Sequence, residues 1–205
     1  MFNSECGNVW GYEGSAGDGD WSWDYHIMIN EFRRHPQVCG WLYTEHHDVI
    51  NEWNGYWRYD RSQKFTGLSD IVEGMTIRDF HSPFYIALAR ELCTTVRPGQ
   101  WVDVPLYTSF MTDQAVDGDL TLDMSLFGWN SLGLEETYWQ GSRQVPYRPW
   151  MHEALDPLSV KMPTQSALAI LAVTLKQANG DVLHRNFTAY QVTDGTSPRK
   201  ATIKS

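Results

Sequence analysis

The first third of the chain alternates apolar segments with polar connections, in an order typical of a strand, a helix and a second strand. Residues 2–7 form a short strand-like entry. Apolar residues recur at helical spacing from Trp21 to Arg34, and Pro36 prevents the helix from continuing. An apolar run at 38–43 then predicts a second strand. We therefore expect one strand–helix–strand unit with parallel strands.

The second half of the chain predicts short strands separated by turns. Leu120, Leu122, Met124 and Leu126 alternate with polar residues, which is typical of a strand with one buried face. Further strands are expected at 84–89, 102–107, 167–175 and 181–192, with a hairpin turn at Asn179-Gly180 between the last two. This pattern predicts an antiparallel β-sandwich of about 100 residues, the size of an immunoglobulin-type module.

The composition changes near Pro83, which divides the chain into two parts. We expect residues 1–82 to form one unit, residues 83–195 to form the sandwich, and residues 196–205 to be a tail or linker. Segment 133–158 is rich in Trp, Tyr, Arg and Pro and interrupts the strand pattern. The sequence does not assign it to an element.

Charge and composition exclude several partners. The net charge of −9 argues against nucleic acid, because a phosphate-binding surface needs clustered Lys and Arg. No stretch approaches the roughly 20 apolar residues of a membrane span, so we expect no membrane partner. Cys6, Cys39 and Cys93 form no metal-binding pattern, and we expect free thiols and no cofactor. Ten Trp and ten Tyr exceed what a core of this size requires, which leaves rings for sugar stacking.

Titratable side chains follow the second predicted strand directly. The apolar run 39–43 leads without a turn residue into 44–48, Thr-Glu-His-His-Asp, where a structural loop more often has Gly, Pro or Ser. Trp53 and Trp57 follow in the same polar segment. Carboxylates, imidazoles and flat rings at the C-terminal end of a buried strand predict a site for a sugar or another polyol on a β/α barrel.

Two motifs in the first 61 residues resemble glycoside hydrolase family 2. Segment 40–61, GWLYTEHHDVINEWNGYWRYDR, is similar to the family's pattern at the eighth barrel strand and its loop. Segment 4–7, Ser-Glu-Cys-Gly, resembles the shorter Ser-Glu-Phe-Gly motif of the seventh strand. The resemblance implies an α/β plus all-β chain. Its parts would be the last two βα units of a (β/α)8 barrel and a following immunoglobulin-like antiparallel β-sandwich.

The resemblance also implies a mechanism. The Glu of the seventh strand is the family's nucleophile in a retaining reaction, so Glu5 is the implied catalytic residue. A retaining glycosidase needs a second carboxylate about 5–5.5 Å away as general acid/base. In the family that Glu lies in an Asn-Glu pair on the fourth strand, upstream of the position of Glu5. We therefore expect a fragment of a β-glycosidase that cleaves terminal β-linked sugars by double displacement and is inactive alone. Without the resemblance, Glu5 would be interpreted as a surface glutamate.

The strand end and its loop supply the residues expected to bind substrate. These are Tyr43, Glu45, His46, Asp48, Trp53 and Trp57. His46 and His47 are adjacent and would point to opposite sides of an extended chain, so we expect no metal site. Cys6 replaces the usual aromatic of the family motif, and Glu45 replaces a more frequent Gln. The resemblance therefore does not fix the sugar.

A function of another class stays open. The chain is also compatible with a non-catalytic carbohydrate-binding or interaction module whose surface is the aromatic-rich segment 129–150. Expected partners are a carbohydrate substrate and either the remainder of the parent enzyme or a second copy bound through the truncated barrel. No signal peptide precedes the first element, and the location of the parent enzyme, periplasmic or secreted, is not indicated. Parallel strands with unpaired edges in residues 1–60 favour the fragment, and a core closed with the sandwich favours the module.

Overall fold

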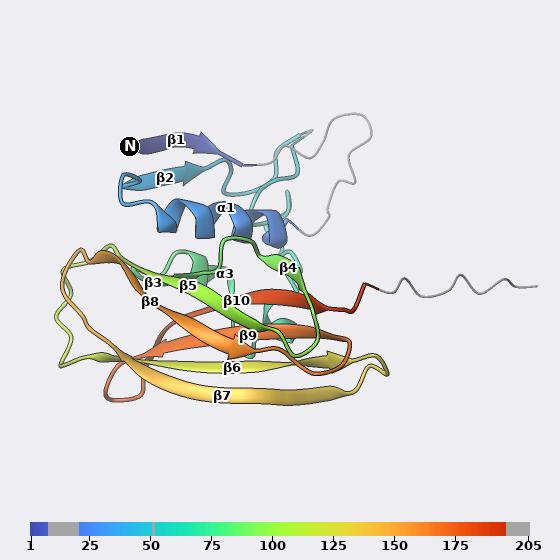
Figure 1. The fold of residues 1–205 in the computed structure, drawn as a ribbon. Coiled ribbons are helices and arrows are strands. Elements are labelled where there is room, and N and C mark those ends of the chain that lie inside the picture. The colour runs from blue at the N-terminus through green and yellow to red at the C-terminus, as the bar shows by residue number, and fades with distance from the viewer. Residues whose placement is uncertain (8–20, 51, 196–205) are drawn as a thin grey trace, which may run out of the picture.

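The first third of the protein is a strand–helix–strand unit. The computed structural model describes residues 1–7, 21–50 and 52–195. The elements of this unit are β1 (Phe2–Cys6), α1 (Ser22–Arg34) and β2 (Gly40–Tyr43). Strands β1 and β2 pair in parallel and lie outermost, with α1 between them and the rest of the molecule (Figure 1). The predicted strand–helix–strand unit with parallel strands is confirmed.

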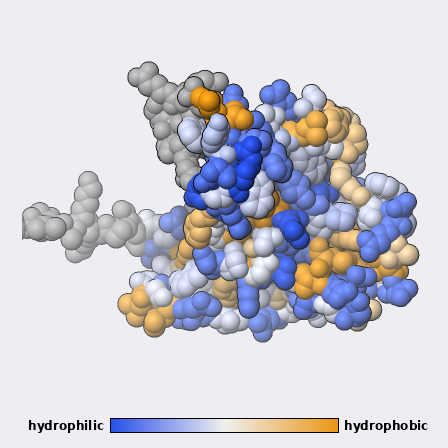
Figure 2. Space-filling model, turned by 180° about the vertical axis from the view of Figure 1, so that it is seen from behind, coloured by the Kyte–Doolittle hydropathy of each residue, from blue (hydrophilic) through white to orange (hydrophobic). Residues whose placement is uncertain are grey.

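Among the described residues, β1 and β2 form a sheet of their own. Parallel strands are ordinarily covered on both faces. Here Phe2 is 54% exposed and Leu42 is 57% exposed. From behind, hydrophobic side chains lie on the surface at the end of the molecule where β1 and β2 are located (Figure 2). Both outer edges of the pair and part of its faces are therefore open within the described part of the chain.

The rest of the described chain is dominated by a β-sandwich of three-stranded and five-stranded sheets. Its strands are β3 (Phe84–Leu88), β4 (Cys93–Val96), β5 (Trp101–Phe110), β6 (Leu120–Asn130), β7 (Glu135–Val145), β8 (His152–Lys161), β9 (Ala167–Lys176) and β10 (Val182–Val192). The strand orders are β3-β5-β8 and β4-β10-β9-β6-β7. Pairing is antiparallel except between β4 and β10. The predicted sandwich is confirmed.

The sandwich core follows the predicted alternation on β6. Leu120, Leu122, Met124 and Leu126 are each at most 5% exposed, and the residues between them are only half-buried. They pack in one cluster with residues from both sheets, including Ile86 on β3. Burial of each such aliphatic side chain contributes about 1.5–3 kcal/mol, so this cluster is the main stabilising element of the sandwich.

Two parts of the sandwich were not anticipated from the sequence. Segment 133–158 contains β7 and most of β8, and β4 was not predicted at all. Both β7 and β8 are edge strands with much of their surface exposed, so their hydrophobic alternation is weak. Pro157 lies within β8, a position that an edge strand tolerates. In the described residues no further strand pairs with β1 or β2, so the predicted barrel part stays a prediction, and the predicted tail 196–205 lies outside them.

The segment between β2 and the sandwich contains two single helical turns. These are α2 (Leu68–Ile71) and α3 (Ile77–Phe80). Thr76 begins α3 with a capping box, in which its hydroxyl accepts from Arg78 N and the Asp79 carboxylate accepts from Thr76 N. The Asp79 carboxylate also accepts from Arg185 N at 2.7 Å, which fastens α3 to β10.

Helix α1 packs on the sandwich through a second hydrophobic cluster. Trp21 at the N-cap of α1 and Tyr25 and Ile29 on the helix are each at most 2% exposed. They share this cluster with Phe80 on α3 and Phe187 on β10. The first third of the chain is thus joined to the sandwich by a closed apolar contact.

Buried hydrogen bonds fix the position of α1 over β3 and β10. The Asn186 amide nitrogen donates to Ile86 O at 2.8 Å, so the Asn186 side-chain oxygen is the acceptor facing His26. His26 therefore donates from Nε2 to that oxygen at 2.5 Å. Asn30 on α1 donates to Leu88 O at 3.1 Å and accepts from Leu88 N at 3.3 Å. These directional bonds allow one placement of the helix on the sandwich.

Arg33 connects the end of α1 to its surroundings. It is 3% exposed, and its guanidinium donates to Ser82 O at 2.9 Å and to Phe80 O at 3.4 Å. The same group lies 4.8 Å from the ring centroid of Trp41 on β2 and 5.0 Å from that of Tyr85 on β3. Burial lowers the pKa of Arg33 to about 10, so the side chain stays charged at neutral pH.

Buried histidines predict that the fold loses stability in mild acid. His26 and His184 are fully buried, and burial lowers their pKa values from 6.5 to about 4 and about 3. Below pH 6.5 the unfolded chain binds protons that the folded protein does not, so stability falls as pH falls. Between pH 6 and 4.5, the free energy of unfolding should fall by about 1.4 kcal/mol per pH unit for each histidine. Urea denaturation at several pH values measures this slope.

The control is the exposed, non-titrating Leu132. Leu132→Gln should leave the slope unchanged, whereas His26→Gln and His184→Gln should each reduce it. An identical slope in all three variants would contradict the assignment, whatever their stability at neutral pH.

Candidate active site

The C-terminal ends of β1 and β2 lie in direct contact. Thr44 N donates to Cys6 O at 2.8 Å. Gly7 follows with φ of +151°, and a side chain there would collide with Thr44 O, so the close approach requires glycine. Glu5 precedes Cys6, and Glu45 follows Thr44. The fold thus brings two carboxyl-bearing residues to the same edge of the parallel pair.

The predicted nucleophile, Glu5, lies on the exposed part of β1. Its backbone N–H donates to Asn3 Oδ1 at 3.1 Å. The side chain is exposed, so its carboxylate is hydrated and accessible to a ligand. The structure therefore places Glu5 at a strand end next to open space, and its catalytic role stays a prediction.

Glu45 lies in a different electrostatic environment. It is half-buried, and its peptide bond with Thr44 is cis. Burial raises the pKa of the Glu45 carboxyl, and the nearby Glu52 and Asp48 carboxyl groups raise it further. A carboxyl that keeps its proton to higher pH can donate as well as accept a hydrogen bond. That property suits contact with a sugar hydroxyl.

Asp48 belongs to a buried ion pair. Its Oδ1 accepts from Lys64 Nζ at 2.7 Å and from Gly55 N at 2.9 Å, and both charged side chains are 1% exposed. Lys64 also donates to Trp53 O at 2.7 Å. Asp48 therefore holds the loop that follows β2 together from beneath. Its predicted contact with substrate stays a prediction.

Tyr43 is part of an aromatic cluster that joins β2, α1 and the following loop. Its ring centroid lies 4.7 Å from those of Tyr25 and Tyr56 and 5.8 Å from that of Trp21. The hydroxyl donates to Asn54 O at 2.5 Å. Burial raises the pKa of Tyr43 above its ordinary value, so the side chain is a neutral donor. The packing of the Tyr43 ring therefore stabilises the C-terminal end of β2, which Glu45 follows in the chain.

The other predicted substrate-binding residues fall in two places. His46 is exposed and, with Tyr43, lines a pocket of about 460 Å³ beside β2. Trp53 and Asp48 line another pocket of about 270 Å³. Residues 53–57 contain no helical turn, so the four-residue spacing of Trp53 and Trp57 does not place them on one side. Trp57 is 39% exposed and is bridged through its backbone to His47.

Two residues that shape the site escaped the sequence analysis. Lys64 neutralises Asp48 from 16 positions further along the chain, in a segment with no periodic pattern. Glu52 acts on the Glu45 carboxyl through proximity in space. Glu52 lies inside the motif that resembles the family pattern, and that motif was its only indication in the sequence. No sequence pattern indicated a role for Lys64.

The aromatic residues of segment 129–150 do not form one surface. Trp129 packs against the cluster beneath α1, and Tyr147 packs against the sandwich core. Trp150 is 64% exposed. Tyr138 and Trp139 line one groove together. Segment 129–150 as the surface of a binding module stays a prediction.

Residues 1–7, 21–50 and 52–195 contain neither a metal-binding cluster nor a membrane-spanning helix. Over these ranges no group of three or more His, Cys, Asp or Glu side chains is arranged to hold a metal ion. Cys6, Cys39 and Cys93 are free thiols. None of the described helices is long and apolar enough to cross a membrane.

Comparison with known proteins shows similarity in solved structures alone. No protein-family profile and no curated protein sequence matches the chain. About half of the chain resembles part of a β-galactosidase-like protein from Bacteroides fragilis, with 16% identity and a TM-score of 0.33. A β-glucuronidase of glycoside hydrolase family 2 gives 9% identity and 0.34. A sporulation control protein from Bacillus subtilis gives 12% identity and 0.34.

These similarities cover 54%, 53% and 53% of this chain. The matched parts are 16%, 11% and 49% of the three proteins, so the chain spans only part of their length. At these identities and TM-scores, the similarity assigns no activity to the chain.

The buried ion pair predicts a large loss of stability when one partner is removed. Lys64→Met should lower the free energy of unfolding by about 3–5 kcal/mol, because Asp48 is left as an uncompensated buried charge. Adding Asp48→Asn should recover much of this loss, since Asn keeps an acceptor for Gly55 N and carries no charge. Urea denaturation of the single and double variants measures the coupling. A Lys64→Met variant as stable as the parent would refute the ion pair.

Proposed function

We propose that this chain is the C-terminal part of a retaining β-glycosidase similar to glycoside hydrolase family 2, with Glu5 as the nucleophile. One observation carries the proposal. The parallel strands β1 and β2 end at a common edge, with Glu5 at the end of one strand and Glu45 after the other. In (β/α)8 barrels the catalytic groups are placed at this edge, because the βα loops converge there.

The unpaired outer edges of β1 and β2 support the proposal that further barrel strands lie beside them. Each strand has one hydrogen-bonded neighbour within the described residues. Exposed Phe2 and Leu42 supply apolar surface on a sheet that is normally covered on both faces. Additional strands would pair with both edges and bury these side chains. They would also carry the general acid/base that the mechanism needs.

The strand order of the sandwich supports an immunoglobulin-like assignment for the second part. If β3, β5 and β8 correspond to strands A, B and E, they share one sheet as in that fold. Strands β6, β9 and β10 then correspond to C, F and G, which share the other. The arrangement of a barrel end followed by such a sandwich is what the sequence resemblance implies.

The chemistry assigns different tasks to the two carboxyl groups. The exposed and hydrated Glu5 carboxylate can attack an anomeric carbon. Glu45, whose pKa is raised, can donate a hydrogen bond to a sugar hydroxyl beside the nucleophile. Tyr43 and the Asp48–Lys64 pair hold the strand end and its loop in place. These contacts give the site rigidity before substrate binds.

A non-catalytic binding module is the second candidate, and the closed contact between α1 and the sandwich favours it. Trp21, Tyr25 and Ile29 bury themselves against the sandwich, as a self-sufficient module would require. The exposed Phe2 and Leu42 argue in the other direction, because a self-sufficient module would cover them. Activity and labelling measurements separate the two.

The proposal predicts that Glu5 is labelled by a mechanism-based inhibitor. A protein extended by the in-frame coding sequence upstream of Met1 should react with a 2-deoxy-2-fluoroglycosyl fluoride, and mass spectrometry should locate the sugar on Glu5. Glu5→Gln should lower turnover of aryl β-glycosides by several orders of magnitude, because the covalent step loses its nucleophile.

Asp103→Asn is the control for that experiment. Asp103 is an exposed residue on β5 of the sandwich, and its substitution should leave turnover unchanged. Labelling of Glu45 or Glu52 in place of Glu5 would overturn the assignment of the nucleophile.

The proposal also predicts that the 205-residue chain hydrolyses no glycoside by itself. General acid/base catalysis contributes about 10²–10⁴-fold, and the proposal assigns the acid/base to another strand. The missing barrel walls would also orient the sugar, a contribution of about 7–11 kcal/mol. An assay with 4-nitrophenyl β-glycosides at pH 7 checks this. Turnover that disappears in Glu5→Gln would show that a second carboxylate of this chain completes the pair.

A further inference from the structure

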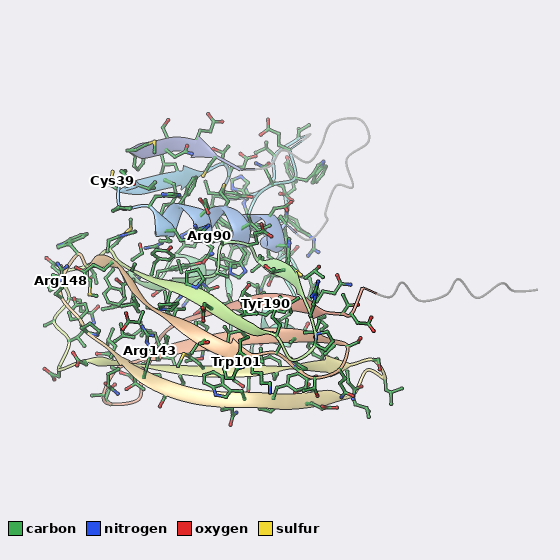
Figure 3. All side chains as sticks on the ribbon, viewed as in Figure 1. Cys39, Arg90, Trp101, Arg143, Arg148 and Tyr190 are labelled. Atoms are coloured by element: carbon green, nitrogen blue, oxygen red, sulfur yellow. The ribbon has the colours of Figure 1, made fainter. Side chains whose placement is uncertain are left out.

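A groove lined by aromatic rings runs along the open side of the sandwich. Its volume is about 540 Å³, and it lies between β7 and β8, the edge strands of the two sheets. Trp101, Tyr138 and Trp139 supply the rings. Figure 3 shows Trp101 on this side of the sandwich, with Arg143 further along the same side. Arg143 donates from β7 to Asp156 O on β8 at 2.8 Å, which bridges the two edges beyond the groove.

A β-bulge places two consecutive aromatic residues in the same groove. The pairing of β7 with β6 shifts between Leu126–Trp139 and Phe127–Thr137, which leaves Tyr138 as an extra residue. In a regular strand, Tyr138 and Trp139 would point to opposite faces. Bulges redirect side chains, and here both rings are half-buried against the sandwich core and both line the groove.

The Trp139 indole has a defined position. A Cβ on Gly141 would lie 2.6 Å from its ring, so the indole lies across bare backbone two residues further along β7. Rings held in this way lose little conformational freedom when a ligand binds. Trp101 complements them from the start of β5. It is 63% exposed and pairs across the strands with Lys161 of β8.

We propose that this groove binds a short neutral oligosaccharide of pyranose units, stacked on Trp101 and Trp139. Flat rings bind the apolar C–H faces of such sugars, and the 63% exposed Trp101 indole lies in the same groove as the half-buried Trp139 ring. Hydroxyl groups of Thr137, Ser159 and Thr164 and the Lys161 ammonium line the same groove and can bind the sugar hydroxyls. The one ionic side chain in this lining is Lys161, so the site suits a neutral ligand.

This binding site is independent of the proposed catalytic function. Its residues come from β5, β7, β8 and the turn after β8, whereas Glu5 and Glu45 belong to β1 and the end of β2. Glu5→Gln should therefore bind the oligosaccharide as the parent does. If the binding proposal fails, the catalytic proposal is unaffected, and the reverse also holds.

Isothermal titration calorimetry on the 205-residue chain, with cellotetraose and mannotetraose as probes, tests the proposal. At least one probe should bind, and Trp101→Ala should weaken it about tenfold or more, as expected for an aromatic anchor. Gly141→Ala should weaken binding, because the added Cβ displaces the Trp139 indole from its position. The indole itself is kept in this variant. Trp150→Ala, which removes an equally exposed indole elsewhere, should bind as the parent does.

A footprint on the parent protein makes the test independent of how the variants fold. Mild oxidation with N-bromosuccinimide, read by mass spectrometry, should show protection of Trp101 by saturating oligosaccharide and no protection of Trp150. The absence of binding by both probes would overturn the proposal. So would equal protection of both residues, or binding of a proline-rich peptide at Trp101 that neither sugar displaces.

Discussion

The buried contact between α1 and the sandwich is the constraint on which the arrangement of this protein depends. Apolar side chains of α1 close a core with β10, and the Asn186–His26 bond fixes the helix along its axis. An apolar contact alone tolerates sliding, whereas buried amide and imidazole groups lose their partners if the helix moves. Since α1 connects β1 to β2, the same contact also determines where that strand pair and its polar edge lie.

The pair β1–β2 then has a rigid support on one side and open surface on the other. Arg33 joins the support to β2 through the Trp41 ring, and Tyr43 continues this packing to the strand end. The outward parts of the pair, including Phe2 and Leu42, stay exposed. Within the described residues, the pair therefore combines a fixed polar strand edge with two unpaired outer edges.

Aromatic residues, abundant in this chain, serve three distinct purposes. Tyr25 and Tyr43 pack into the junction between α1 and β2, and the half-buried Tyr147 packs against the sandwich core. Trp101 and Trp139 line the groove between the two edge strands. Composition indicates only that rings exceed the needs of a core. Strand register, a bulge and a glycine determine which of them meet at a surface.

The sequence by itself determined the regular elements and their order, because period-2 and helical patterns reflect which side of each element is buried. It thereby predicted α1, the parallel pair and the strong alternation of β6. Edge strand β7 has no strong pattern, since solvent covers much of it. Only the tertiary structure decided the Asp48–Lys64 pair, the raised pKa of Glu45 and the shared groove of Tyr138 and Trp139. Each depends either on distances between residues from separate segments or on a register shift. The spacing of residues along the chain does not indicate either of these.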